Sequence, residues 1–383
     1  MISLEPSLAQ EIVERTMQVI PFNVNVMDAH GIILGSGDPE RLGEQHTGAR
    51  LALAEGKAVE FDAATARTLR GVKPGVNLPL NVRGKVRGVI GITGDPEKVR
   101  RFGELVRVMA EMILEQARLV SELQHEKRYR EEFVDQLIRR GGTPRDDLEL
   151  WGNRLGVDFR MPHSALVLEL IEEGVAPDRA LVELQACQQR LARHDARLLM
   201  AVISPRELVI LKALDVAGKE TDLSELAREQ LTTLYEVAAQ GAAVPSAMAL
   251  GVALACIEGA HLSYLCARRT LAVGRRRDPS ERLFSFYDLS FPVLLSELGS
   301  GWQAQHLARP LRLLAQRDRS RLLRKSLKAW FDEDCLVDRA ARRLAVHRNT
   351  LDYRLRKVNQ ITRLDLARID DRLMLYAALQ MEE

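Results

Sequence analysis

Apolar positions along the first hundred residues follow two different spacings. Residues 6–20 carry apolar side chains at the spacing of one helix face, which predicts an amphipathic helix. Other segments alternate between apolar and polar side chains and end at turn residues, as half-buried strands do. The predicted strands are residues 23–27, 32–34, 76–82 and 86–93. Turns over residues 28–31 and 83–85 join them as two hairpins, so the pattern predicts a compact α/β domain.

A long charged segment over residues 99–140 contains an apolar repeat with alternating steps of four and three. The repeat positions are Phe102, Val106, Met109, Ile113, Gln116, Val120 and Leu123. This spacing predicts a helix whose a and d positions pair with a second copy in a coiled coil, with one polar interruption at Gln116. A single helix packed on its own domain would show the same pattern, and this alternative stays open.

Two short helices that meet at a tight turn are predicted near the end of the chain. Their inward positions are Ala340, Ala341 and Leu344 in the first helix, and Leu351, Leu355 and Val358 in the second. With these side chains inside, Asn349, Tyr353 and Arg356 point outward, where they can reach base edges and phosphates. The spacing is typical of a helix-turn-helix. Ala345 occupies a turn position that often holds glycine, so we expect a somewhat different turn geometry.

Positive charge is concentrated in the same segment. Residues 334–363 contain eight Lys/Arg and three Asp/Glu, a net charge of +5, whereas the whole chain carries +2. A solvated helix face can also carry a run of charges, but the coincidence with helix-turn-helix spacing favours binding to double-stranded DNA. The candidate DNA-binding residues are Arg348, Asn349, Thr350, Tyr353, Arg354, Arg356 and Lys357.

Composition excludes several other classes of protein. The chain has 383 residues, of which 46% are hydrophobic, so it can form two or three domains. Its four cysteines lack metal-ligand spacing, so neither a disulfide framework nor a metal site is expected, and a reducing cytoplasm fits. Acidic residues interrupt the N-terminal segment, and no apolar segment approaches the length of a membrane span. We therefore expect a cytoplasmic protein without a membrane partner.

Both ends of the chain resemble known bacterial regulators. The segments VHRNTLDYRLRKVNQITRLDL and DDRLMLYAALQ resemble the C-terminal helix-turn-helix of PucR-type transcription regulators. The segments LAQEIVERTMQVIPFNVNVMDAHGIILGSGDPERLGEQHTGA, GVKPGVNLPL and GVIGITGDPE are similar to the sugar-diacid recognition domain of carbohydrate diacid regulators of the CdaR/SdaR type. The resemblance implies an activator of genes for uptake and breakdown of glucarate, galactarate or glycerate, with the acid as effector.

Two glycine-rich loops of the N-terminal domain are the candidate effector site. The strand and helix order suggests a PAS- or Cache-like sensor, in which a small metabolite lies between the sheet and the crossing helices. A sugar diacid needs cations, amides, hydroxyls and helix N-termini as partners. The candidate residues are Ser36, Arg41, His46, Gly48, Lys73, Gly75, Val76 and Asn77. Ordinary turns have a similar composition, and neither loop carries a nucleotide-binding glycine motif, so no cofactor is expected.

The middle of the chain, roughly residues 150–275, is the least informative part. Strands are predicted at residues 164–170, 199–204, 207–212 and 247–254, followed by a helix over residues 259–275. Their order resembles the degenerate GGDEF-like domain of the same regulators. An active nucleotide cyclase needs several carboxylates on a strand hairpin to hold metal, and the candidate hairpin contains only Glu207. We therefore expect a scaffold or coupling domain and no catalytic residues.

The combined prediction is a multidomain protein with α/β and all-α parts. It comprises a sensor (residues 1–98), a linker helix (99–140), a degenerate GGDEF-like domain (141–278) and a helix-turn-helix domain (279–383). The expected partners are a sugar diacid or glycerate, double-stranded DNA and a second copy in a homodimer or higher homo-oligomer, with RNA polymerase as a further candidate. The alternative is a signalling enzyme that acts on nucleotides through its middle domain.

Overall fold

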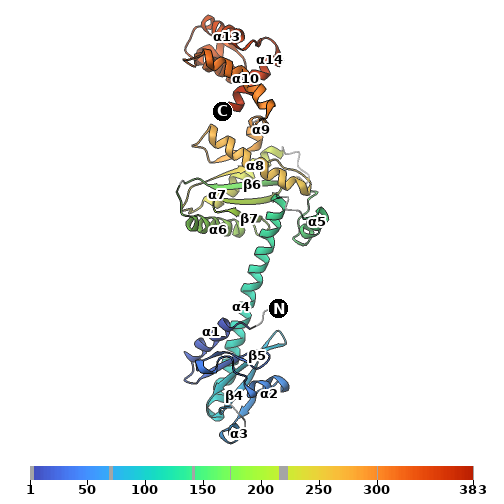
Figure 1. Cartoon of the computed structure of the whole chain (residues 1–383), viewed down its shortest axis with the longest axis vertical. Coiled ribbons are helices and arrows are strands. Elements are labelled where there is room, and N and C mark those ends of the chain that lie inside the picture. Colours follow the sequence, from blue (N-terminus) through green and yellow to red (C-terminus); the bar gives the residue numbers. More distant parts are fainter. Residues whose placement is uncertain are drawn as a thin grey trace. The chain divides into compact units, whose positions relative to one another are not determined.

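The structure, a computed structural model, divides into two compact units, residues 1–127 and 128–383 (Figure 1). It describes residues 4–68, 72–139, 143–172, 174–214, 223–299 and 301–382. The predicted boundary between residues 140 and 141 lies outside these ranges.

The first unit is built on a five-stranded antiparallel sheet with the strand order β2-β1-β5-β4-β3. Its strands are β1 (Val24–Met27), β2 (Ile33–Ser36), β3 (Val59–Phe61), β4 (Gly75–Val82) and β5 (Lys85–Thr93). Its helices are α1 (Pro6–Met17), the short 3-10 helix η1 (Pro39–Arg41), α2 (Thr47–Glu55), α3 (Ala63–Thr68) and the first part of α4 (Pro96–Arg139). Both predicted hairpins are present, while the first helix ends three residues earlier than expected.

Alternation along the strands gives the sensor sheet two buried faces. One face carries Val24, Val26 and Leu78, which pack with α1 and α4 in a single apolar core. The opposite face carries Met27 and Val89, which pack against the small alanines of α2. Because successive strand residues point to opposite faces, Asn25, Asn77 and Gly91, which pair with one another, lie on the face beneath α2.

Helix α4 is continuous over 44 residues. Val106 is fully buried in the sensor core, and Phe102 and Ile113 pack against that core. These three predicted coiled-coil positions therefore pack within their own domain. This agrees with the alternative prediction of a single helix packed on its own domain. Val120 and Leu123, further along, are exposed.

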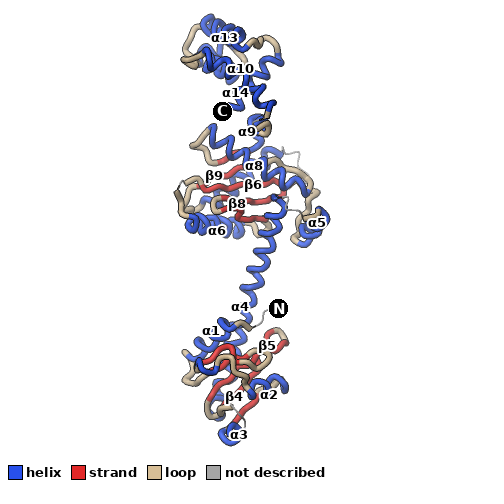
Figure 2. Tube along the Cα trace, in the orientation of Figure 1, coloured by secondary structure: helices blue, strands red, loops and turns tan. Residues whose placement is uncertain are grey.

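The middle domain contains a second five-stranded sheet, with the order β10-β9-β6-β8-β7 (Figure 2). Its elements are α5 (Arg145–Arg154), β6 (His163–Leu170), α6 (Pro177–His194), β7 (Leu199–Ser204), β8 (Glu207–Ala213), α7 (Leu223–Ala239), β9 (Ser246–Leu250), α8 (Ile257–Arg277) and β10 (Leu283–Ser285). Helices α6 and α7 cover one face. The other face is covered by α8 and by the end of α4, where Phe133 and Leu137 are buried. All four predicted strands occur, although β9 ends at Leu250.

The C-terminal part is helical, and one apolar cluster connects most of its helices. The helices are α9 (Phe286–Ser296), α10 (Trp302–Arg317), α11 (Leu322–Asp332), α12 (Val337–Arg343), α13 (Arg348–Thr362) and α14 (Ile369–Glu382). Leu351, Leu355 and Val358 of α13 are buried in this cluster, as the sequence pattern predicted.

The turn between α12 and α13 contains a left-handed alanine. Ala345 has φ 53°, and the Ala345 and Val346 amides donate to the Arg342 and Ala341 carbonyls at 3.1 and 3.0 Å. This is the Schellman pattern, whose left-handed position usually holds glycine. The expectation of a different turn geometry is therefore wrong, because alanine adopts the glycine conformation.

Replacement of this alanine by glycine should stabilise the turn. A left-handed conformation costs an L-residue about 1–2 kcal/mol, and glycine removes this cost. The greater flexibility of glycine in the unfolded chain offsets about 0.5–1 kcal/mol of the stabilisation. We expect Ala345→Gly to slow hydrogen exchange of the α13 amides, with a net stabilisation of about 0.5–1 kcal/mol. The control Ala341→Gly lies inside α12 and should destabilise by about 1 kcal/mol. Faster exchange in Ala345→Gly would contradict the assignment.

Candidate functional site

A row of polar or small residues crosses the sensor sheet beneath α2. Ser36 pairs with Asn25, Asn25 with Gly91, and Gly91 with Asn77 in the strand registers. Directly opposed residues of antiparallel strands point to the same face. The row therefore places polar side chains on three strands. A Cβ atom at Gly91 would lie 3.0 Å from Asn77 Oδ1 and 3.3 Å from Met27 Cε, so glycine lets these side chains lie close to the strand.

The N-terminus of α2 lies over one end of this row. A Cβ atom at Gly48 would lie 2.8 Å from Asn77 Nδ2, 2.8 Å from Phe61 Cε2 and 3.1 Å from His46 Cε1. Only glycine allows the helix to approach Asn77 this closely. The first amides of a helix lack intrahelical partners and favour an anion, so this end of the row is suited to a carboxylate.

The buried polar groups of the row are not all satisfied within the protein. Ser36 Oγ donates to Asn25 Oδ1 at 2.6 Å. By contrast, Asn77 is only 4% exposed, and its Oδ1 has no hydrogen-bond partner among the described residues. A buried acceptor without a donor is costly, so a ligand hydroxyl or amide that donates to Asn77 would relieve that cost.

His46 is a neutral cap of α2. Its Nδ1 accepts a hydrogen bond from the Ala49 amide at 3.1 Å, so the ring proton is assigned to Nε2, which can donate. Burial, together with the nearby positive charge of Arg41, lowers the pKa of His46 to about 4. Arg41 itself is 8% exposed and supplies a buried cation beside the row.

The other predicted effector residues lie differently. Lys73 is exposed, and its Nζ lies 3.5 Å from an oxygen of Asp38. Gly75 and Val76 were expected to offer exposed amides, but both residues lie within the β4 ladder. The Val76 side chain enters the apolar core on the opposite face. The structure thus brings Ser36, Arg41, His46, Gly48 and Asn77 to one face, and does not bring Lys73 or Val76 there.

Asn25, Phe61 and Gly91 belong to this site and were missed in the sequence. A usable signal existed for Asn25, because it is a polar residue inside the short apolar strand VNVM. Gly91 interrupts an apolar strand, which often marks the close approach of a ligand or backbone.

Helix α13 presents the candidate nucleic-acid interface. Its N-cap residue is His347, whose Nδ1 accepts from the Asn349 amide at 3.2 Å. The exposed predicted residues are Asn349, Thr350, Tyr353, Arg356 and Lys357. Lys357 Nζ lies 5.1 Å from the Tyr353 ring centre, so the aromatic ring holds this cation near the helix surface. Gln360 is exposed on the same side and was missed.

Two predicted DNA-binding arginines have partners within the protein. Arg348 Nη1 lies 3.2 Å from an Asp338 oxygen, although its side chain remains largely exposed. Arg354 is half-buried, and its Nη1 donates to Ser326 Oγ at 3.2 Å. Arg354 therefore joins α13 to α11 rather than facing outward with Arg356.

The carboxylates of the middle-domain hairpin are held by protein groups. Tyr264 Oη donates to Glu207 Oε1 at 2.7 Å, and burial raises the pKa of this phenol to about 12. Glu169, paired with Glu207 across the strands, accepts from Arg275 at 3.1 Å. Within the part of the chain that the structure describes, no group of three or more His, Cys, Asp or Glu side chains could hold a metal ion.

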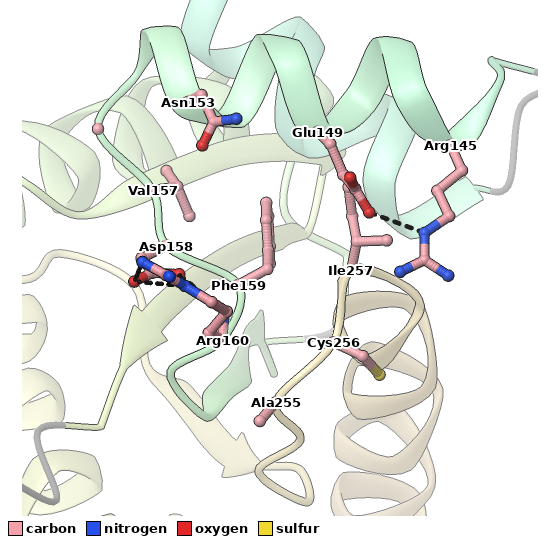
Figure 3. A pocket seen from close by; sticks show the side chains of 11 residues that line it. Arg145, Glu149, Asn153, Val157, Asp158, Phe159, Arg160, Ala255, Cys256 and Ile257 are labelled. Carbon is pink, nitrogen blue, oxygen red and sulfur yellow. Dashed lines mark hydrogen bonds and ion pairs between the residues drawn. The ribbon is translucent and has the colours of Figure 1, made fainter.

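A cavity of about 540 Å³ lies elsewhere in the middle domain, beside α5 and the start of α8 (Figure 3). Its charged side chains pair with one another: Arg145 Nε donates to Glu149 at 2.7 Å, and Arg160 Nη2 to Asp158 at 2.8 Å. The cavity adjoins the beginning of β6, whereas Glu207 pairs with Glu169 near the end of β6. It therefore does not combine with the hairpin carboxylate into one site.

Comparisons with known proteins agree with this architecture. The family model for sugar diacid recognition matches residues 4–137, the model for a GGDEF-like domain matches residues 140–273, and the model for the PucR C-terminal helix-turn-helix matches residues 323–381. The carbohydrate diacid regulator of Escherichia coli (strain K12) is 43% identical over 383 residues, which cover 99% of this chain and 98% of that protein. The chain belongs to the carbohydrate diacid regulator family. This regulator is thus a DNA-binding transcription regulator with a helix-turn-helix, and not an enzyme.

A second relative extends the same match. A protein of Haemophilus influenzae is 34% identical to this regulator over 380 residues, 99% of each chain. The resemblance seen in the sequence is confirmed, as are the GGDEF-like middle domain and the helical reader. Among the helices that the structure describes in this regulator, none is both long and apolar enough to cross a membrane.

The neutral His46 predicts how the stability of the sensor depends on pH. Its pKa is about 4 in the folded state and about 6.5 in the unfolded state. Between these values the unfolded chain binds a proton that the folded chain excludes, so stability is complete above pH 6.5 and falls as the pH drops towards 4. The loss should reach about 3 kcal/mol at most.

Urea unfolding of residues 1–127 at several pH values measures this effect. His46→Asn keeps a good helix cap but removes the titrating ring, so its stability should change less between pH 6.5 and 4. A slope as steep in His46→Asn as in the wild type would assign the pH dependence to other groups.

Proposed function

We propose that this regulator activates genes for the uptake and breakdown of sugar diacids, with glucarate, galactarate or glycerate as effector. The observation that carries the proposal is the buried polar row of the sensor, which lies under the N-terminus of α2 and beside a buried arginine. The name of the Escherichia coli relative, a carbohydrate diacid regulator, supports the same class of effector.

The row and the groups beside it suit different parts of a hydroxylated acid. Arg41 and the amides at the start of α2 are suited to a carboxylate, because both supply positive charge in a site shielded from water. His46 Nε2 can donate to a hydroxyl, and the side-chain amide of Asn77 can donate to or accept from hydroxyls. Asn25 and Asn77 lie on either side of Gly91 in the strand register, so both amides are placed to contact neighbouring hydroxyls of one chain of carbons.

The proposed sensor has a PAS- or Cache-like fold. The order hairpin, helix and hairpin around one antiparallel sheet, followed by an exiting helix, supports this assignment. We place the sensor at residues 1–98, the linker helix at 99–140, and the coupling domain and DNA reader after it. The predicted boundary between these last two, at residue 278, moves to residue 285, because β10 pairs with β9 in the middle-domain sheet. The described carboxylates at the middle-domain hairpin are engaged by Tyr264, Arg268 and Arg275, which supports a coupling role.

The proposed reader is α13, which enters the major groove and contacts bases through Asn349 and Arg356. Asparagine can pair with adenine and arginine with guanine by two hydrogen bonds each. Lys357 is placed to neutralise a phosphate. We propose that a cytoplasmic homodimer reads paired half-sites, and that activation proceeds through RNA polymerase as a further partner.

The effector prediction is tested on the full chain by calorimetric titration and thermal unfolding. Glucarate, galactarate or glycerate should bind and raise the melting temperature by mass action, whereas glucose, which lacks a carboxylate, should not. Arg41→Gln should weaken binding at least tenfold, because a hydrogen bond to a charged group contributes about 1.5–3 kcal/mol. Arg15→Gln, an exposed arginine of α1, is the matched control. No binding of any of the three acids to the wild type would refute this effector class.

The DNA prediction is tested by gel shift with the promoter of the adjacent gene. Arg356→Ala and Asn349→Ala should each lose about 1–3 kcal/mol of specific binding. Lys357→Ala should weaken binding to all sequences and reduce the salt slope by about one phosphate contact. Arg179→Ala removes an exposed arginine from α6 and should leave binding unchanged. If the three α13 variants all bind the promoter with the affinity of the wild type, α13 is not the recognition helix.

A further inference from the structure

One face of α4 remains apolar and exposed after the helix has packed on the sensor. Its large apolar side chains are between 45% and 68% exposed: Leu105, Val108, Met112, Leu119, Val120 and Leu123. On a helical projection all of them except Val120 lie well away from Val106 and Ala110, which are buried in the sensor core. Exposed apolar area of this extent along one face marks an interaction surface.

The exposed face is an internal repeat of eleven residues. Residues 104–114 read ELVRVMAEMIL, and residues 115–125 read EQARLVSELQH. Glutamate, arginine and glutamate recur at the first, fourth and eighth positions of both repeats. Val108 and Met112 recur as Leu119 and Leu123, eleven residues later. A repeat of eleven residues spans three turns at about 3.67 residues per turn, so its apolar stripe stays on one side of a nearly straight helix.

The repeated charges form a ladder beside the apolar stripe. Arg107 lies 2.6 Å from Glu104 and 3.0 Å from Glu111. In the second repeat Arg118 lies 2.9 Å from Glu115 and also pairs with Glu122. In each repeat one arginine thus offsets part of the charge of two glutamates, and Arg83 also pairs with Glu115, which reduces the repulsion between like charges when two such helices approach.

We infer that this stripe, defined by Leu105, Val108, Met112, Gln116, Leu119 and Leu123, is the contact surface for the same stripe of a second copy. The two helices run parallel and in register over the two repeats, about 30 Å of helix. The inference deepens the proposed homodimer by naming its contact. It replaces the coiled-coil seam through Val106 and Ile113, because the sensor core already buries those side chains.

The second copy is favoured over a different partner by the stripe itself. Both sides of the contact would present the same repeat, so the apolar positions match without any further requirement. Gln116 is the one polar member of the stripe, and a side-chain amide can both donate to and accept from its own copy. A single polar residue in an apolar seam fixes register, and parallel helices in register bring the two copies of Gln116 together.

Sedimentation equilibrium of the full chain tests the contact. Met112→Glu combined with Leu119→Glu should weaken dimerisation at least a hundredfold, because both substitutions place charge in the apolar contact. These side chains are exposed in the single chain, so the circular dichroism spectrum and the unfolding midpoint should stay near those of the wild type. Leu150→Glu, at an exposed apolar position of α5, is the matched control and should dimerise normally.

Cysteine cross-linking tests the register independently. Under mild oxidation, Gln116→Cys should form a disulfide-linked dimer, whereas Ile113→Cys and the wild type, with its four native cysteines, should not. A monomeric wild type at micromolar concentration, meaning that the stripe is covered by its own chain or another protein, would overturn the inference. So would a double variant that dimerises as tightly as the wild type, or a dimer that fails to cross-link at position 116. Effector binding in the dissociated double variant separates this outcome from failure of the proposed effector site.

Discussion

The structure depends on one unbroken helix that belongs to two hydrophobic cores. The beginning of α4 buries Val99 and Val106 against the sensor sheet, and its end buries Phe133 and Leu137 against the middle-domain sheet. The helix shares this role with α1 on the sensor sheet and with α8 on the middle-domain sheet. A helix of this length gains little from intrinsic propensity alone, and packing at both ends is what stabilises it. Any change in the sensor core thus acts directly on an element that the middle domain also needs.

The sensor site shows how the same sheet serves stability and binding. Beneath α1 and α4 the sheet is uniformly apolar, whereas beneath α2 it carries asparagines and glycine. The Asn77 Oδ1 acceptor without a partner and the neutral, buried His46 both reduce the stability of this face. An effector that forms hydrogen bonds with Asn77 and His46 would recover this lost stability when it binds. The face that is proposed to bind the effector is therefore less stable in the free protein than the same face with these groups satisfied.

The sequence was sufficient wherever a local pattern determines the structure. The spacing of Leu351, Leu355 and Val358 located α13, and alternation located the strands. It was insufficient where packing between distant segments decides. Nothing local shows that Arg354 turns towards Ser326, or that the Val76 amide is used by neighbouring strands. The predicted coiled-coil seam of α4 included Val106, which packs in the sensor core. Apolar residues lie on two faces of this helix, and periodicity alone cannot separate the face that packs on the sensor from the face that stays exposed.

The continuity of α4 also restricts how this family can change in length. Each added residue in a helix advances it by about 1.5 Å and turns it by about 100°. One residue inserted within the sensor part of α4, between Val99 and Leu114, would turn the later core positions away from the sensor sheet. An insertion of seven or eleven residues nearly restores the original face. Natural variation in the length of this part of α4 should therefore come in such steps, while surface loops vary more freely.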